Sequence, residues 1–433
     1  MISDSLYNRI LALLRREVKP ALGCTEPIAV ALSVARAASL GKDVQKVRVS
    51  VSANILKNAM GVGIPGTGQV GLPVAAALAV EGGKWELGLE LFRDIDSKAV
   101  EMAREFVARS RVEVKMADTG KLLYSCAECF FANGSRGCCI IEDAHDSIVF
   151  LSLDDNILFD RRQTSDNVPE SSPVQDEPQG DFLSLELIYE FAKTCRLEDL
   201  DLMREQVRLN TALSEEGLKG NYGLNVGRTL VADVNREVFG NDLCTRCMSM
   251  TAAASDARMS GCILPAMSNS GSGNQGITVS LPVVAAARHL KCSEEELLRA
   301  LVLSNLVAIH IKSYLGKLSA LCGCVVASTG SACGIVLLRG GSAQQMGWAV
   351  KNMIGSITGM ICDGAKEGCA MKVASGVSCA LQSAVLALDG ICVPESDGII
   401  DKDVEKTIRN LGRIGSRGMK STDSMILDIM LCK

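Results

Sequence analysis

Residues 318–338 read LSALCGCVVASTGSACGIVLL and contain no charged side chain. The stretch is long enough to span a membrane as a helix. However, glycine, serine and threonine recur through it, and Lys312 and Lys317 stand just before it. Small residues at this density are typical of helices that pack closely inside a protein. We therefore interpret the stretch as a buried helix-loop-helix segment of a soluble domain and expect no membrane partner.

The composition of the rest of the chain agrees with dense helical packing. Of 433 residues, 48% are hydrophobic but only 4% are aromatic, and 40 are glycine. A core built from small aliphatic residues suits closely packed helices. The 45 basic and 50 acidic residues give a formal net charge of −5 without a dense basic run. This balance argues against a nucleic-acid partner.

The alternation of apolar and polar residues predicts an α+β fold with a mainly helical C-terminal domain and a smaller mixed α/β unit. Helical periodicity over residues 5–18 and small residues after Thr25 predict two N-terminal helices that pack on the C-terminal domain. Residues 44–54 alternate as a strand, a helix is expected over 95–110, and strand-like runs follow between 112 and 153. The predicted segments are an N-terminal helical pair (1–44), the α/β unit (45–160), a polar Pro-containing linker (161–182) and the helical domain (183–433).

Two glycine-rich loops each precede a helix of small residues. Gly66-Thr67-Gly68 is followed by LPVAAA, and Gly271-Ser272-Gly273 by LPVVAAA. Exposed N–H groups at such a helix start can bind a carboxylate or phosphate, although the glycines can equally serve close packing. Together with nearby polar residues, the loops form our predicted substrate site. Its residues are Ser52, Asn54, Asn58, Gly61, Gly63, Gly66, Thr67, Ser270, Gly271, Ser272, Gly273, Asn274 and Gln275.

The chain has eighteen cysteines. The N-terminal segment lacks the apolar centre of a signal peptide, so we expect reduced thiols and a cytoplasmic location. Most cysteines stand singly in apolar helical runs and are expected to pack as small hydrophobic residues. Cys126-x-x-Cys129 and Cys244-x-x-Cys247 have zinc spacing, but they fall in different predicted units, and the first pair lies in a strand-like run. Zinc is the less favoured interpretation.

The cysteines between residues 318 and 369 differ from the others because they stand on glycine-containing turns. Leu321-Cys322-Gly323-Cys324 and the stretch CDGAKEGC over residues 362–369 leave room for a cluster whose sulfides accept hydrogen bonds from free N–H groups. Three thiolates would hold a [4Fe–4S] cluster and leave one iron open as a Lewis acid.

Four motifs together resemble the L-cysteine desulfidase family, which is related to the iron–sulfur L-serine dehydratase α-chains. They are ALGCTEP at residues 21–27, GVGIPGT at 61–67, LSALCGC at 318–324 and CDGAK-x-x-C at 362–369, and the similarity runs over nearly the whole chain. The resemblance implies an oxygen-sensitive [4Fe–4S] cluster and β-elimination of sulfide from L-cysteine, giving pyruvate and ammonia. It also implies that Cys322, Cys362 and Cys369 are cluster ligands and that Cys24 is the active-site thiol.

Position also favours Cys24, because it stands just before a predicted helix whose N-terminus would stabilise its thiolate as a base. Of the three histidines, His145 is the best candidate for a pocket, although a structural role is the more common one. The expected partner is a small amino acid, and a homo-oligomer such as a dimer is compatible with the sequence. Alternatives are a serine dehydratase-like ammonia-lyase, a non-catalytic iron–sulfur redox sensor and a small-anion binding protein.

Overall fold

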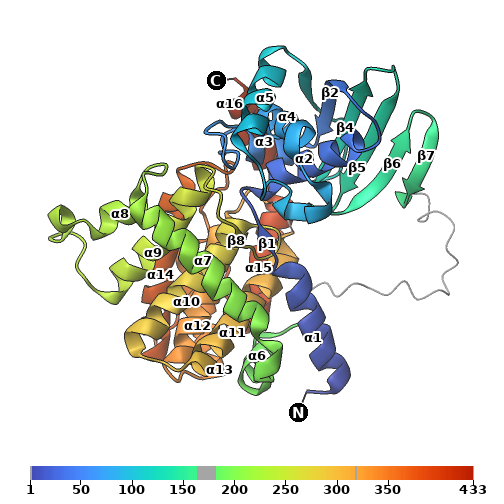
Figure 1. Ribbon diagram of the computed structural model, residues 1–433. Helices are drawn as coiled ribbons and strands as arrows, with labels where there is room; N and C mark the ends of the chain where they lie inside the picture. The colour runs from blue at the N-terminus through green and yellow to red at the C-terminus, as the bar shows by residue number, and fades with distance from the viewer. Residues whose placement is uncertain (1, 163–181, 317–318, 433) are drawn as a thin grey trace, which may run out of the picture.

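Two hydrophobic cores organise the protein, one around a β-sheet and one among helices alone. The computed structural model describes residues 2–162, 182–316 and 319–432, so most of the expected linker lies outside the described residues. In Figure 1 the sheet and its helices form the upper part, and the helical region lies below it. This is the α+β class expected from the sequence.

The helices are α1 (Asp4–Glu17), α2 (Thr25–Ala38), α3 (Ala53–Ala59), α4 (Leu72–Gly82), α5 (Ser97–Ala108), α6 (Leu185–Thr194), α7 (Asp201–Lys219), α8 (Val226–Val231), α9 (Leu243–Met259), α10 (Gly273–Leu290), α11 (Glu294–Leu315), α12 (Gly323–Leu338), α13 (Ala343–Ile357), α14 (Cys369–Leu388), α15 (Val404–Arg413) and α16 (Lys420–Leu431). Short 3₁₀ turns η1 (Trp85–Glu90), η3 (Leu197–Asp199) and η4 (Asp233–Asn235) and a π-helical turn η5 (Ile414–Gly418) connect them.

The main sheet has six strands in the order β3-β2-β4-β5-β6-β7. β2 and β3 are parallel, and every other pair in this sheet is antiparallel. Alternate side chains of β2, namely Val47, Val49 and Val51, are fully buried against the helices. The strands are β2 (Val44–Val51), β3 (Val112–Met116), β4 (Tyr124–Phe131), β5 (Arg136–Glu142), β6 (Ile148–Leu153) and β7 (Asn156–Asp160).

The first of these strands is shorter than the alternation over residues 44–54 predicts. β2 ends at Val51 because Ser52 is the N-cap of α3, which begins at Ala53. Asn54 and Asn58 therefore stand four residues apart on one helix, on the same face, rather than on a strand.

The two N-terminal helices separate instead of packing as a pair on the helical region. The apolar stripe of α1, including Ile10, Leu13 and Leu14, packs into the helical core. Helix α2 is buried nearly all round, and its residues, such as Ile28 and Val30, belong to the sheet core. The short antiparallel pair β1 (Pro20–Ala21) and β8 (Ala266–Met267) joins the two regions between these helices. The domain limits inferred from the sequence remain predictions.

The uncharged stretch at residues 318–338 supplies α12 at the centre of the helical core. Its glycines allow close approach to neighbouring helices: a Cβ added at Gly330 would lie 2.4 Å from the Ser304 carbonyl oxygen on α11. At Gly334 an added Cβ would lie 2.8 Å from Val283 on α10. The small residues of α12 therefore serve close helix packing, as expected of a buried segment.

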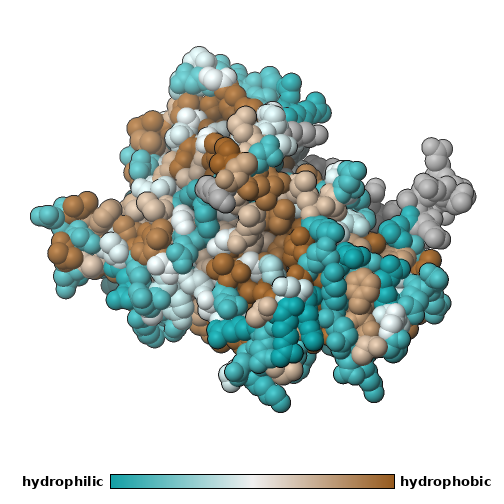
Figure 2. Space-filling view, turned by 90° about the horizontal axis from the view of Figure 1, so that it is seen from above, coloured by the Kyte–Doolittle hydropathy of each residue, from teal (hydrophilic) through white to brown (hydrophobic). Residues whose placement is uncertain are grey.

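Two other helices, α11 and α14, are long and apolar enough to cross a membrane by length and composition. In their most apolar windows, 78% and 50% of the residues are buried inside the protein, and core helices of soluble proteins pass the same test. Seen from above in Figure 2, apolar residues gather toward the middle of the face while hydrophilic residues cover most of its rim.

Candidate active site

The two cores meet at Cys24, which precedes α2. Cys24 is 3% exposed and shares a small apolar cluster with Val62, Met259 and Cys369, against which Ala365 also packs. These residues come from the N-cap of α2, the segment before the first glycine-rich loop, α9 and the start of α14. The fold thus places the predicted active-site thiol beside one of the predicted cluster ligands.

The Cys-Gly-Cys turn and the segment before the other two predicted ligands are paired through their backbones. The Cys322 N–H donates to the Met360 carbonyl at 2.9 Å, and the Cys362 N–H donates to the Ala320 carbonyl at 2.7 Å. Cys369 opens α14, and its thiol is directed at the Gly364 carbonyl at 3.7 Å. Thus Cys322 and Cys369 lie at the starts of α12 and α14, and Cys362 lies beside the backbone pairing of Leu321 with Ile361. Turn positions of this kind are what the motifs predicted.

Gly364 explains why this turn needs glycine. Its φ is +91°, a conformation that residues with a side chain rarely adopt, and an added Cβ would lie 2.4 Å from the Lys57 carbonyl oxygen on α3. Gly61 faces the same turn, 3.8 Å from the Ala365 carbonyl oxygen by the same measure. The turn that carries Cys362 and Cys369 is therefore held against α3.

The charges around these thiols suit an anionic group. Within the Cys-Gly-Cys turn, the hydrogen bond from the Cys324 thiol lowers the pKa of Cys322 to about 6 despite burial. The same contact and burial raise the pKa of Cys324 well above its usual value. Three lysines also act on these thiols: Lys312 and Lys372 on Cys322, and Lys57 and Lys372 on Cys362.

Two of these lysines are buried. Lys57 is 2% exposed and pairs with Asp423 on α16 at 2.5 Å, where α16 lies beside α3 (Figure 1). Lys312 is 8% exposed and has no ion-pair partner among the described residues. Burial lowers the pKa of Lys312, and the neighbouring Cys362, Cys322 and Glu26 only partly offset it. A buried, unpaired ammonium requires a compensating negative charge nearby.

The donor set therefore fits an iron–sulfur cluster better than a single ion. In the part of the chain that the structure describes, no three His, Cys, Asp or Glu side chains lie close enough to hold one metal ion. A four-iron cluster is larger, and its thiolates surround the cluster instead of one atom. The half-buried Cys362 and the buried Cys322 and Cys369, with buried lysines beside them, supply soft ligands and charge compensation.

The two zinc-spaced pairs are divided between the cores. Cys129 is fully buried in the sheet core, whereas Cys126 faces the other side of β4, its sulfur 3.9 Å from that of Cys138. Cys247 is fully buried in the helical core. Alternate residues of a strand point to opposite faces, so the first pair cannot converge on one ion.

Glu26 is a central site residue that the sequence motif contained but to which we assigned no role. Its carboxylate accepts hydrogen bonds from the Cys24 thiol at 3.0 Å, the Thr25 hydroxyl at 3.1 Å and the Asn58 amide at 3.1 Å. Burial by itself would raise the pKa of Glu26. The charges of His145 and Arg258 and the hydrogen bond from Cys24 together have the larger effect, so the pKa of Glu26 is lowered. Glu26 is therefore a buried carboxylate.

Cys24 differs from the thiolate that its position predicted. Cys24 is the N-cap residue of α2, and its side chain makes no capping hydrogen bond. Burial, followed by the charge of Glu26, raises the pKa of Cys24 well above its usual value, and Arg258 only partly opposes this. The helix N-terminus is thus outweighed, and the thiol is protonated and donates to Glu26.

The second glycine-rich loop lies against this group. The Thr25 hydroxyl donates to the Gly271 carbonyl at 2.7 Å, and a Cβ added at Gly271 would lie 3.0 Å from His145 Nδ1. A Cβ at Gly323, in the Cys-Gly-Cys turn, would lie 3.0 Å from Gln275 Oε1. The loop therefore lies against Thr25, His145 and the Cys-Gly-Cys turn.

Several of the predicted substrate residues have structural partners instead. The Ser52 hydroxyl donates to the Leu122 carbonyl, the Thr67 hydroxyl to the Ile64 carbonyl, and the Ser270 hydroxyl to Asn269. Ser272 caps α10 through the Gln275 N–H. Gly63 pairs with Val70 and its N–H donates to the Met259 carbonyl. Their side chains or backbone groups are thus engaged in holding the loops.

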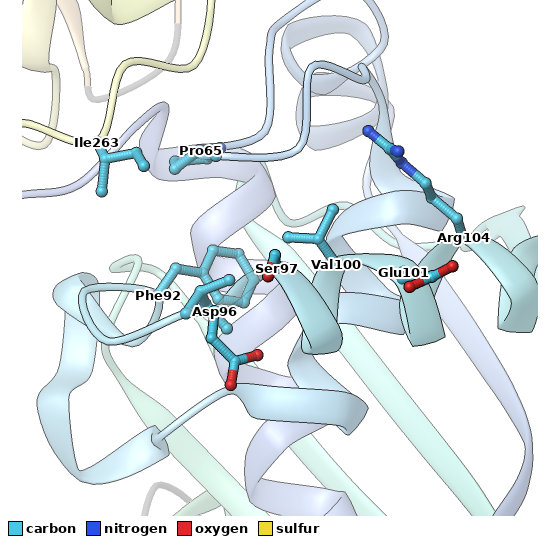
Figure 3. A pocket seen from close by; sticks show the side chains of 10 residues that line it. Pro65, Phe92, Asp96, Ser97, Val100, Glu101, Arg104 and Ile263 are labelled. Atoms are coloured by element: carbon cyan, nitrogen blue, oxygen red, sulfur yellow. The ribbon is translucent and has the colours of Figure 1, made fainter.

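The first glycine-rich loop borders a surface cavity of about 600 Å³ rather than the buried site. Pro65 and Gly66 line it. Figure 3 shows Pro65 and Ile263 on one side of the cavity and the start of α5 on the other. None of the predicted cysteines lines this cavity. The chemistry-bearing groups lie on the buried side of the loop, so we place the candidate site there.

Comparison with known proteins shows the family of the chain. Residues 86–428 match the family model "Serine dehydratase alpha chain", so the chain belongs to this lyase-related, iron–sulfur associated family. Three of its relatives are called "UPF0597 protein". The one from Bacteroides thetaiotaomicron is 48% identical over 99% of both chains, and that from Porphyromonas gingivalis is 46% identical over the whole of both. The one from Oleidesulfovibrio alaskensis is 47% identical over 99% of this chain and 98% of its own.

Arg258 and the two buried lysines were missed by sequence reasoning. Arg258 does leave a signal: with Asp256 it is one of two charged residues in the small-residue run TAAASDARM of α9. A charged side chain in a helix that is buried on all sides destabilises the fold unless a partner or a ligand compensates the charge. Lys312 was noticed only as a flank of the uncharged stretch, and nothing in the local sequence distinguishes Lys57.

Proposed function

We propose that the protein is an iron–sulfur L-cysteine desulfidase that eliminates sulfide from L-cysteine to give pyruvate and ammonia. The observation that carries the proposal is that Cys24 and Cys369 belong to the same buried apolar cluster. This contact brings the proposed active-site thiol to the turn that carries the predicted iron ligands. The motif resemblance supplies the substrate. A [4Fe–4S] cluster held by Cys322, Cys362 and Cys369 would supply a Lewis acid for the leaving sulfide.

The chain's own residues supply proton transfer and charge compensation. Cys24 donates its proton to Glu26 in a 3.0 Å hydrogen bond, so this pair can hold and move one proton beside the ligands. The Glu26 carboxylate can take up the Cα proton while the Cys24 thiol supplies a proton to the departing sulfide, and the hydrogen bond between them returns the proton from Glu26 to Cys24. Lys312 and Lys57 compensate the negative charge of the thiolates and of the leaving group.

The discriminating experiment is anaerobic purification followed by a sulfide-release assay with L-cysteine. We expect a brown protein with absorbance near 400 nm and turnover of L-cysteine. Cys322→Ser, Cys362→Ser and Cys369→Ser should each lose iron and activity, whereas Cys138→Ser, on the sheet, should keep both. Colour without turnover would instead support an iron–sulfur sensor, and a colourless protein that binds amino acids a binding protein.

Cys24→Ala tests the proton-transfer role separately. If Cys24 moves a proton and is not a ligand, this variant should keep its iron and visible spectrum while turnover falls by roughly two to four orders of magnitude. Loss of iron from Cys24→Ala would reassign Cys24 as a ligand.

The family description favours one second candidate, L-serine deamination by the same elimination chemistry. Comparison of kcat/KM for L-cysteine and L-serine decides between them. A free amino acid as the partner, assembly as a homo-oligomer and a cytoplasmic location are further proposals.

A further inference from the structure

Buried polar atoms without partners mark where a ligand belongs, because a native fold leaves few such groups unpaired. Asn54 and Asn58 on α3, Arg258 on α9 and Gln275 on α10 each carry such an atom. The donors are Arg258 Nε and Asn54 Nδ2, and the acceptors are Asn58 Oδ1 and Gln275 Oε1. A zwitterionic amino acid, with an accepting carboxylate and a donating ammonium, has the complementary pattern.

Arg258 is the strongest of these groups. Its side chain is 3% exposed, and among the described residues it forms no ion pair. Among the described residues its Nη1 donates to Asn274 Oδ1 at 3.2 Å, in the second glycine-rich loop. A guanidinium buried without a carboxylate is expensive, and a planar carboxylate is the ligand that its fork fits best.

The position of Arg258 agrees with a ligand role. It acts electrostatically on both Cys24 and Glu26, which places it at the same site. A Cβ added at Gly273 would lie only 2.2 Å from Arg258 Nε, so the absence of a side chain at Gly273 makes room for the guanidinium. The loop is thus shaped around Arg258.

Asn58 provides the opposite polarity. Its amide N–H donates to Glu26 Oε1, which leaves the carbonyl oxygen of a side chain only 7% exposed without a donor. An ammonium group bound to this oxygen would also lie in the negative field of the Glu26 carboxylate. The Arg258 guanidinium offers only donors, whereas Asn58 Oδ1 offers an acceptor, so the two ends of the ligand are distinguished.

We propose that Arg258 binds the α-carboxylate of the amino acid and that Asn58 Oδ1, beside Glu26, binds its α-ammonium group. This assignment rests on the proposed function and restricts the ligands to free α-amino acids. Thiol amines that lack the carboxylate and N-acylated amino acids that lack the ammonium should bind measurably but more weakly.

The test is a binding cycle on the purified, cluster-loaded protein with unreactive probes. Isothermal titration compares L-alanine, L-alaninamide, which lacks the carboxylate, and N-acetyl-L-alanine, which lacks the ammonium. Arg258→Met should weaken the binding of L-alanine about 10- to 100-fold, which is the effect of losing a charge-assisted hydrogen bond. The affinity for L-alaninamide should stay unchanged. Asn58→Ala should weaken the binding of L-alanine but leave the affinity for N-acetyl-L-alanine unchanged.

Two further variants keep the outcome decisive. Arg258→Lys retains the charge without the fork and should give an intermediate loss, also confined to ligands with a carboxylate. Arg104→Met, on the surface cavity, is the control and should bind L-alanine normally. Equal weakening of L-alanine and L-alaninamide by both Arg258 variants would overturn the assignment. Tight binding of L-alanine without sulfide release from L-cysteine would instead contradict the proposed function but still support this binding assignment.

Discussion

The two glycine-rich loops look alike in sequence but serve different ends in the fold. The loop at residues 270–275 turns inward, where Thr25, His145 and Arg258 lie against it and Gln275 keeps an unpartnered oxygen. The loop at residues 63–68 borders the surface cavity, and its Thr67 hydroxyl is used within its own turn. A glycine-rich loop before a helix is therefore not a site by itself.

Unsatisfied buried groups make the difference. The inner loop begins α10 with Ser272 as its N-cap and leaves the buried Gln275 Oε1 without a partner. The outer loop begins α4 after Gly71, without a side-chain cap, and places no unpaired buried side-chain atom among its own residues. The following variants test whether this distinction holds for catalysis and stability.

The largest effect is expected from Gly273→Ala, matched with Gly68→Ala. The new methyl group at position 273 would collide with Arg258 Nε, whereas one at position 68 meets nothing within 4 Å. Sulfide release should fall about 100-fold in Gly273→Ala because the carboxylate-binding group is displaced. Gly68→Ala should keep its rate but lose about 1 kcal/mol of stability, since φ there is +65°. Equal losses of rate would contradict the comparison.

Asp256→Asn tests how much the scaffold of the inner site depends on pH. Burial raises the pKa of Asp256 to about 6, and its Oδ1 has no partner among the described residues. Because the folded state binds this proton more tightly than the unfolded chain, the contribution is stabilising below about pH 4 and is lost as the pH rises through 6. The variant should gain about 1–2 kcal/mol at pH 8 and little at pH 4. Thermal melts at both pH values decide, and a larger gain at pH 4 would refute the interpretation.

Gln275→Ala and Thr67→Val compare one polar side chain in each loop. Gln275 holds Asn269 through its amide and presents Oε1 toward the Cys-Gly-Cys turn, so kcat/KM should fall about tenfold. Thr67→Val removes a hydrogen bond inside a turn and should leave kcat/KM unchanged. Steady-state kinetics of both variants are the measurement, and a tenfold loss in Thr67→Val would return the outer loop to the site.

The smallest effect is expected from Arg104→Met. The Arg104 guanidinium donates to the Thr67 carbonyl at 2.6 Å and so ties α5 to the outer loop. Its loss should cost about 1 kcal/mol of unfolding free energy, with sulfide release unchanged. A denaturant titration measures the first and the sulfide assay the second. A change in rate without a change in stability would show that the outer loop communicates with the site.

Much of the architecture was predictable because its signals are local. The stripe of α1, the alternation in β2 and the small residues of α12 follow from the 3.6- and 2-residue periods of helix and strand. Cys362 and Cys369 stand out for the same reason, since their glycine turn fixes both within eight residues. The end of β2 before Ser52 was not predicted, because the alternation continues to residue 54 and Ser52 makes no side-chain capping hydrogen bond that would mark the start of α3.

The sequence by itself determined the α+β class, the buried uncharged helix and the thiol-bearing turns, because each depends on neighbours along the chain. Only the tertiary structure decided that α2 joins the sheet core, that Cys24 is protonated by burial beside Glu26, and that Arg258 has no carboxylate partner. Burial and electrostatic environment are properties of groups brought together from distant segments. No local pattern contains them, because the free energy of a buried charge depends on every element packed around it.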